Sequence, residues 1–121
     1  MTELLLAILI GLKQPDKPRI IPLERSTIDQ VDIYAEIWDE LAPQAKSIVW
    51  CESRGDRFAT NGVHIGLFQI NYKIWGKEYG VTRDDLFDER INNLVAKRIY
   101  DRSGNWKMWD CQKAVVRQDN L

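Results

Sequence analysis

Apolar residues recur at helical spacing in two stretches in the first half of the chain. The first stretch predicts a helix over residues 28–41, capped by Ser26 or Thr27. The apolar face of this helix holds Ile33, Ile37, Trp38 and Leu41. The second stretch predicts a helix that begins near Pro43, a residue suited to a first turn, and ends at Gly55. Its buried side holds Ala45, Ile48 and Val49.

A third helical pattern, the longest, follows in the second half of the chain. Residues 82–85, Thr-Arg-Asp-Asp, form a capping signal before it. The helix itself is predicted from Asp88 to about Arg102. We expect its core face to be formed by Ile91, Leu94, Val95, Arg98 and Ile99.

Between the second and third helices the pattern becomes an alternating one. Residues 63–70 alternate loosely and predict a small, irregular β-hairpin, with a turn signal at Asn61-Gly62. Gln69 and Asn71 alternate with apolar neighbours, so their two amides should share a face. The alternative for both amides is plain exposure to solvent.

The two ends of the chain differ from this central part. Leu4–Leu12 is an apolar run that is too short to span a bilayer by itself. It is an export signal, a partial anchor in peripheral contact with a membrane, or a helix that packs on the domain. Residues 13–25 hold three prolines among charges and predict a linker or an extended arm. The predicted organisation is an N-terminal segment over 1–25, a domain over 26–113 and a C-terminal tail over 114–121, frayed from Arg117.

The composition narrows the class of protein. A chain of 121 residues with 45% apolar and 29% charged residues fits one small globular domain. Its 17 basic and 18 acidic residues give a net charge of −1, which argues against a nucleic-acid partner. The single His64 and two distant cysteines cannot assemble a metal cluster, and we expect no metal and no cofactor.

One residue stands out for its chemistry. Glu52 ends the apolar run of the second helix and follows Trp50 and Cys51. Poor solvation beside an indole should raise the pKa of this carboxyl. A carboxylic acid that is still protonated near neutral pH can donate a proton to a leaving group, and the Ser53 hydroxyl can orient it or a substrate. The alternative is an ordinary glutamate that faces water.

A second motif favours the proton-donating role of Glu52 over the water-facing alternative. Fourteen residues after Glu52 comes Gly66-Leu67-Phe68-Gln69-Ile70-Asn71. Glu52-Ser53 followed by this motif resembles the paired signature of the lytic transglycosylase domain of the lysozyme superfamily. The form Cys51-Glu52-Ser53-x-Gly55, with a late Trp109-Asp110-Cys111, also resembles the resuscitation-promoting factors, which are small secreted relatives with the same catalytic glutamate. The resemblance covers roughly residues 45–112.

The resemblance implies a fold, a substrate and a site. The fold would be mainly α (α+β), lysozyme-like, with a small β-hairpin beside the catalytic helix. The substrate would be the glycan strands of peptidoglycan, cut between N-acetylmuramic acid and N-acetylglucosamine. Glu52 would be catalytic, and Gly66 would let the backbone approach it or a sugar. The substrate-binding residues would be Ser53, Gln69, Asn71, Asn93 and Tyr100.

The same resemblance also predicts the state of the two cysteines. Two free thiols are the default in a cytosolic chain. Likeness to secreted relatives instead implies a disulfide between Cys51 and Cys111 and an extracytoplasmic location. The enzyme could serve cell-wall remodelling, a larger wall-penetrating assembly, or a bacteriophage particle that crosses the wall.

The mechanism depends on how many carboxyl groups act. Glycoside hydrolysis normally uses two, and the nearest second candidate is Asp56. With Glu52 alone, the family's route closes an anhydro ring on the sugar without water. The alternatives are a lysozyme-type hydrolase that uses Asp56 or an activated water, and a non-catalytic wall-binding or structural module.

Overall fold

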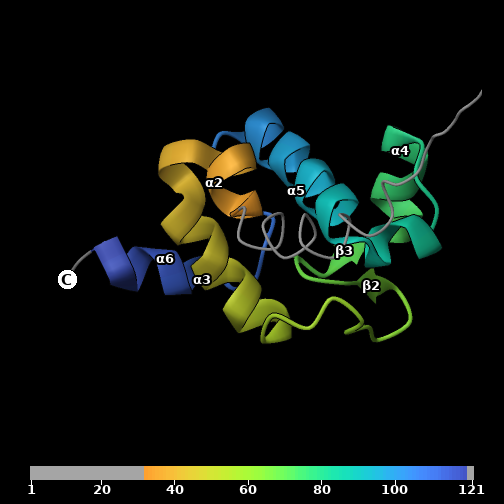
Figure 1. Cartoon of the computed structure of the whole chain (residues 1–121), viewed down its shortest axis with the longest axis horizontal. Helices are drawn as coiled ribbons and strands as arrows, with labels where there is room; N and C mark the ends of the chain where they lie inside the picture. The colour runs from red at the N-terminus through yellow and green to blue at the C-terminus, as the bar shows by residue number, and fades with distance from the viewer. Residues whose placement is uncertain (1–31, 120–121) are drawn as a thin grey trace, which may run out of the picture. The chain divides into compact units, whose positions relative to one another are not determined.

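The computed structural model describes the backbone of residues 32–119 and the side chains of residues 32–115. The expectations for Leu4–Leu12, for the proline-containing arm and for the cap at Ser26 or Thr27 lie outside the described residues. The described part is mainly helical, with one small antiparallel sheet, as predicted for an α+β fold (Figure 1). In chain order its elements are α2 (Ile33–Trp38), η2 (Asp39–Leu41), α3 (Ala42–Ser53), β2 (His64–Ile65), β3 (Ile70–Asn71), η3 (Tyr72–Gly76), α4 (Lys77–Tyr79), η4 (Asp84–Phe87), α5 (Glu89–Ser103) and α6 (Gln112–Asp119).

Helix α3 begins and ends close to the predicted positions. Pro43 lies in its first turn, where the missing backbone N–H costs nothing. At the other end Arg54 and Gly55 both have positive φ, 57° and 78°. The Arg54 N–H donates to the Trp50 carbonyl at 3.0 Å, which closes the last turn. Glu52 therefore lies in the final turn of this helix.

The core is built around an aromatic cluster. The Trp38 ring lies 5.0 Å from the ring of Trp106 and 5.3 Å from that of Phe68, measured between centroids. Trp109 donates from its indole to the Phe68 carbonyl at 2.9 Å. Both late tryptophans are buried, and their N–H groups have partners, as buried indoles require. The C-terminal segment is thereby packed into the core.

The core face of α5 differs from the predicted one. Leu94 is 46% exposed and Arg98 is exposed, whereas Asn92 and Asn93 are fully buried. A hydrophobic pattern cannot identify this face, because the helix meets backbone groups of the hairpin there. Asn92 supplies the hydrogen bonds that those buried groups need.

The predicted hairpin forms, and the predicted turn precedes it. β2 and β3 are antiparallel, with His64 opposite Asn71 and Ile65 opposite Ile70. The turn that connects them is residues 66–69, closed by a 3.0 Å hydrogen bond from the Gln69 N–H to the Gly66 carbonyl. The Asn61-Gly62 turn lies before β2, between the bridged residues Thr60 and Ile65, as the sequence predicts.

Asn92 fixes this turn to the helix. Its Oδ1 accepts from the Phe68 N–H at 2.9 Å, and its Nδ2 donates to the carbonyls of Ile65 and Leu86 at 2.9 and 2.8 Å. Gly66 has φ 77°, and a Cβ there would lie 2.5 Å from the Asn92 Nδ2. The close approach at Gly66 is therefore to Asn92 and the Leu86 carbonyl rather than to the acid, and an approach to a sugar stays a prediction.

A disulfide joins the end of α3 to the segment that directly precedes α6. Cys51 and Cys111 are bonded, with their Cα atoms 6.0 Å apart, as the resemblance implied. The chain then continues as α6, which packs against α3. Val115 is 4% exposed, so the segment predicted as a C-terminal tail from residue 114 begins as part of a helix packed on the domain. Within the described residues, no helix is long and apolar enough to cross a membrane.

Candidate active site

Glu52 is half-buried at the end of α3. Its Oε2 accepts a hydrogen bond of 3.4 Å from the backbone N–H of Cys111. Burial raises the pKa of Glu52, and the negative charge of Asp110 adds to this effect. The Cys111 N–H and the nearby His64 act in the opposite direction but do not cancel it. The carboxyl thus holds its proton to a higher pH than an exposed glutamate does.

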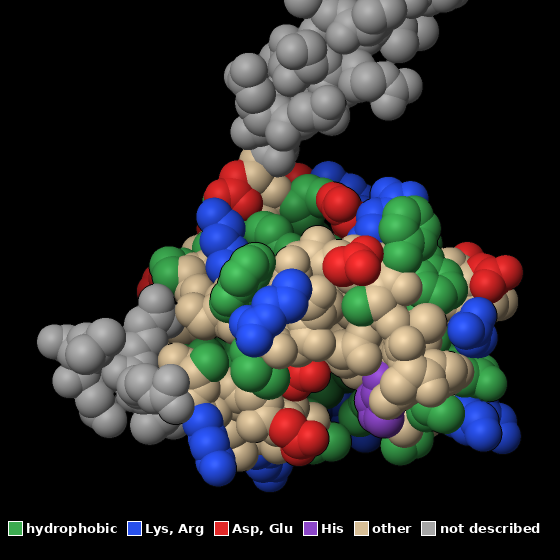
Figure 2. Space-filling model, turned by 90° about the horizontal axis from the view of Figure 1, so that it is seen from below, with side chains coloured by type: hydrophobic (Ala, Val, Ile, Leu, Met, Phe, Trp, Pro, Cys, Tyr) green, Lys and Arg blue, Asp and Glu red, His purple; other side chains and the backbone are tan. Residues whose placement is uncertain are grey.

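The indole expected beside this acid is not its neighbour. Trp50 is 61% exposed, and the guanidinium of Arg54 lies 5.3 Å from the centre of its ring. The hydrogen bond from Cys111 places the C-terminal segment against Glu52 instead. Figure 2 views the molecule from the side where α3 ends, and charged, polar and hydrophobic side chains are interspersed there.

A pocket of about 190 Å³ is formed mainly by the hairpin and the residues that follow it, and Glu52 is not among its lining residues. Two of its residues link it to the acid. His64 lines the pocket and lowers the pKa of Glu52, and Trp109 lines it two residues before Cys111, whose N–H donates to Glu52. This volume is below the roughly 300–1,000 Å³ of drug-sized sites, so it suits a small group. The lining residues are His64, Gln69, Ile70, Asn71, Ile74, Trp75, Ile99, Met108 and Trp109.

The two predicted amides both line this pocket. The Gln69 Nε2 donates to the carbonyls of Ala59 and Gly66 at 3.0 and 2.9 Å. The Asn71 Oδ1 accepts from the N–H groups of Lys73 and Ile74, which begin the helical turn after β3. These bonds hold both side chains in fixed orientations at the pocket wall.

Ser53 does not take the predicted position. It is 7% exposed, its Oγ donates to the Val49 carbonyl at 3.1 Å, and it accepts from the Gly55 N–H at 3.3 Å. The hydroxyl therefore satisfies backbone groups at the end of α3 rather than facing Glu52 or the pocket.

Asn93 and Tyr100 also belong to the core rather than to the pocket. Asn93 is fully buried, accepts from the Trp38 indole at 2.9 Å and donates to the Glu89 carbonyl at 3.0 Å. The half-buried Tyr100 ring lies 4.7 Å from that of Trp106. The face of α5 that carries both residues meets the aromatic cluster, so neither lines the pocket.

The sequence did not single out Asp110 or assign a site role to His64. Asp110 follows from the disulfide, because a bridge from Cys111 to the residue before Glu52 brings the two acids together. The expected second acid, Asp56, is exposed, and its Oδ1 accepts from the Phe58 N–H at 2.9 Å. Asp56 thus stabilises a turn, and Asp110 replaces it as the candidate second carboxyl.

Two further searches bear on the site. In the described part of the chain, no group of three or more His, Cys, Asp and Glu side chains is placed to hold a metal ion. No protein-family model matches the chain, and neither the curated proteins nor the solved structures contain a match. The functional interpretation therefore depends on the residues themselves.

Proposed function

We propose that the chain is a peptidoglycan-cleaving enzyme of the lytic transglycosylase type, with a lysozyme-like fold and Glu52 as its acid and base. The environment of Glu52 supports this most strongly. It is a half-buried carboxyl with a raised pKa, and its neighbour His64 lines a pocket together with two oriented amides and an indole. Perturbed carboxyls next to pockets are typical of proton-transfer sites.

The proposed reaction uses Glu52 twice. The protonated carboxyl donates its proton to the oxygen between N-acetylmuramic acid and N-acetylglucosamine. The bond between that oxygen and N-acetylmuramic acid then breaks. The sugar's own N-acetyl group stabilises the positive centre that forms. The Glu52 carboxylate then removes the proton of the 6-hydroxyl, whose oxygen closes the anhydro ring. Glu52 ends as it began, and no water is consumed.

The surroundings of Glu52 suit both steps. Burial and the Asp110 charge favour the protonated form needed first. The Cys111 N–H stabilises the carboxylate that exists between the steps. Gln69 and Asn71 would contact the N-acetyl group from the pocket wall, whereas Ser53, Asn93 and Tyr100 would act only through packing.

A lysozyme-type hydrolase is the second candidate, and one observation favours it. Asp110 is close enough to Glu52 to raise its pKa, so it could serve as the second carboxyl of a hydrolytic pair. In either case the Cys51–Cys111 bridge supports an oxidising, extracytoplasmic location.

Product mass distinguishes these two candidates. Purified protein is incubated with peptidoglycan, and the released fragments are analysed by mass spectrometry. The proposal predicts anhydro ends, one water lighter than hydrolysed ends. Hydrated reducing ends as the main product would establish the hydrolase, and no release at all would contradict both.

A further inference from the structure

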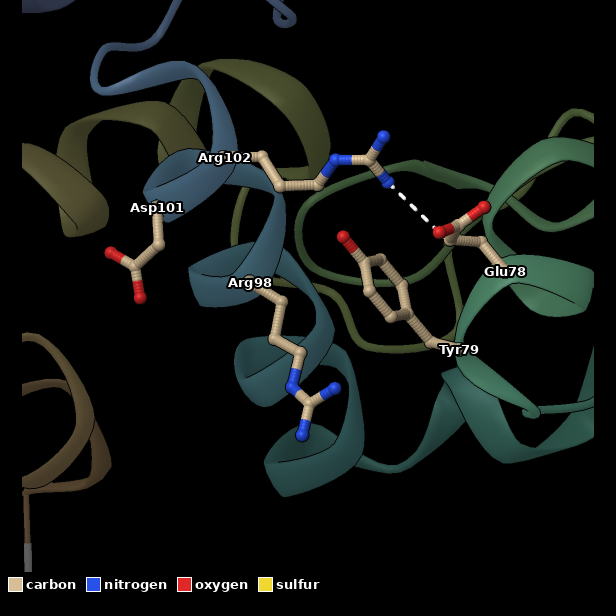
Figure 3. A pocket seen from close by; sticks show the side chains of 5 residues that line it. All are labelled: Glu78, Tyr79, Arg98, Asp101 and Arg102. Atoms are coloured by element: carbon tan, nitrogen blue, oxygen red, sulfur yellow. Dashed lines mark ion pairs between the residues drawn. The ribbon is translucent and has the colours of Figure 1, made fainter.

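A second pocket lies between α4 and α5 and has no part in the chemistry of Glu52. It has a volume of about 460 Å³ and is lined by Glu78, Tyr79, Arg98, Asp101 and Arg102. Figure 3 shows Tyr79 directed from its helix toward α5, with Arg98 and Arg102 on either side of it.

The charges around this pocket leave one cation without an acidic partner. Arg102 pairs with Glu78 at 3.1 Å, and Lys97 pairs with Asp101 at 2.9 Å. Arg98 lies over the Tyr79 ring, 5.7 Å from its centre, and forms no ion pair among the described residues. Both acids that line the pocket are thus paired with another cation, Glu78 with Arg102 and Asp101 with Lys97 from outside the pocket, and Arg98 is left without an acidic partner among the described residues.

The Tyr79 hydroxyl also has no acceptor for its proton. Its oxygen is buried and forms no hydrogen bond of ordinary geometry within the described part of the chain. It does interact with Arg102 closely enough to raise the pKa of that guanidinium, together with Glu78, but a guanidinium can only donate to the hydroxyl. Buried polar groups are nearly always hydrogen-bonded, so this hydroxyl calls for an acceptor. A carboxylate fits, because it can accept from a hydroxyl and from a guanidinium at once.

Trp75 links this pocket to the one that Gln69 and Asn71 line. It lines that pocket and contacts residues of the pocket between α4 and α5. Its ring stacks on Tyr79 at 5.8 Å with an interplanar angle of 11°, and Arg102 lies 5.5 Å from its centre. A ligand that occupies the first pocket could therefore extend a side group past Trp75 into the second.

We propose that the pocket between α4 and α5 binds a free carboxylate of the short peptide that branches from the glycan strand. Arg98 and the Tyr79 hydroxyl would hold that carboxylate. The identity of the ligand rests on the proposed function, whereas the preference for a carboxylate rests on the pocket alone.

A titration followed by NMR tests the carboxylate preference without any cleavage. The probes are N-acetyl-L-alanyl-D-glutamate, with two free carboxylates, and its neutral diamide. We expect the acid to shift the side-chain signals of Arg98, Arg102 and Tyr79, and the diamide to leave them unchanged. Equal binding of both probes, no binding by the acid, or shifts confined to other residues would overturn the proposal.

Two variants and a matched control refine this test. Arg98→Gln and Tyr79→Phe should each weaken binding of the acid by at least about fivefold, since each removes one charge-assisted contact worth roughly 1 kcal/mol or more. Arg90→Gln makes the same change on the same helix, at a residue paired with Glu36, and should leave binding unchanged. Tyr79→Phe should lose little thermal stability, because the hydroxyl donates its proton to no acceptor in the described part of the chain. Parent-like binding by Arg98→Gln would contradict the assignment.

Cleavage assays then test the substrate. The parent should cleave intact peptidoglycan faster than glycan strands stripped of their peptides. The Arg98→Gln variant should cleave the two substrates at the same rate. Equal rates for the parent would refute the peptide as the ligand. Failure of the parent to cleave either substrate would refute the proposed function and leave the binding result standing.

Discussion

At the scale of single residues, the environment of Glu52 combines opposing influences. Burial and Asp110 favour the neutral acid, while the Cys111 N–H and His64 favour the carboxylate. The sequence predicted the position of Glu52 and the direction of its pKa shift, because a helix end after an apolar run is a local feature. Desolvation was predicted as the cause, as found, but Trp50, the indole expected beside the acid, is exposed. The Cys111 N–H that contacts Glu52 comes from 59 residues away along the chain.

The raised pKa of Glu52 has a consequence for stability. Since the folded state binds this proton more tightly than the unfolded state, the stabilisation is present below the unfolded pKa and is lost as pH rises through the folded pKa. Glu52→Gln stays neutral at every pH. The free energy of unfolding of this variant, relative to that of the parent, should therefore be higher at about pH 7 than at about pH 4. Urea unfolding at both pH values measures this gain. A constant difference between the two proteins would show that the pKa is not raised.

Single substitutions also test whether one or two carboxyl groups take part in the reaction. Asp56→Asn should cost less than about tenfold in rate, because a turn hydrogen bond is worth roughly 1 kcal/mol. Asp110→Asn should likewise cost less than about tenfold. A catalytic second carboxyl would cost on the order of 1000-fold. Initial rates of wall clearance measure both, and a thousandfold loss in either variant would replace the single-carboxyl mechanism by a hydrolytic one.

At the scale of elements, the pocket wall depends on how the hairpin is held. The boundaries of α3 and α5 were predicted from periodicity and caps, because these signals are local. The Asn61-Gly62 turn was predicted, but the turn between the two strands was not located, since Leu67 and Phe68 at its centre are buried rather than exposed. The reason is Asn92, whose role depends on contacts more than twenty residues away and leaves no periodic signal.

Removing the Asn92 side chain should therefore destabilise the protein strongly. Asn92→Ala leaves three buried backbone groups without partners and should cost about 3 kcal/mol or more. Asn61→Ala removes hydrogen bonds to Val63 and His64 at an exposed turn and should cost about 1 kcal/mol. Urea unfolding compares the two variants. Equal losses would contradict the structural role of Asn92.

At the scale of the whole molecule, the disulfide connects the fold to the site. It closes a loop of 60 residues and holds Cys111 where its N–H meets Glu52. The sequence alone left free thiols open, and only the resemblance favoured a bridge. The burial of Val115 and the packing of α6 on α3 follow from that anchorage, which explains why the polar pattern after Cys111 suggested a tail.

Loss of this bridge should affect stability and activity together. In the chain-entropy picture, Cys51→Ser with Cys111→Ser should lower the free energy of unfolding by about 4 kcal/mol. Under conditions where the variant stays folded, we expect slower cleavage, because Cys111 no longer holds Glu52. Urea unfolding and initial rates measure the two effects. Unchanged values in both would contradict a role for the bridge.

The account depends above all on Glu52 as the group that transfers the proton, and wall clearance by Glu52→Gln tests this most directly. Glutamine keeps the shape and can still accept from Cys111, but it cannot give up a proton as the acid does. Glu40→Gln makes the same change at an exposed position and serves as the control. The account predicts that Glu52→Gln folds like the parent, by circular dichroism, and loses cleavage, while the control keeps its rate. A folded Glu52→Gln variant that clears peptidoglycan at the parent rate would contradict it.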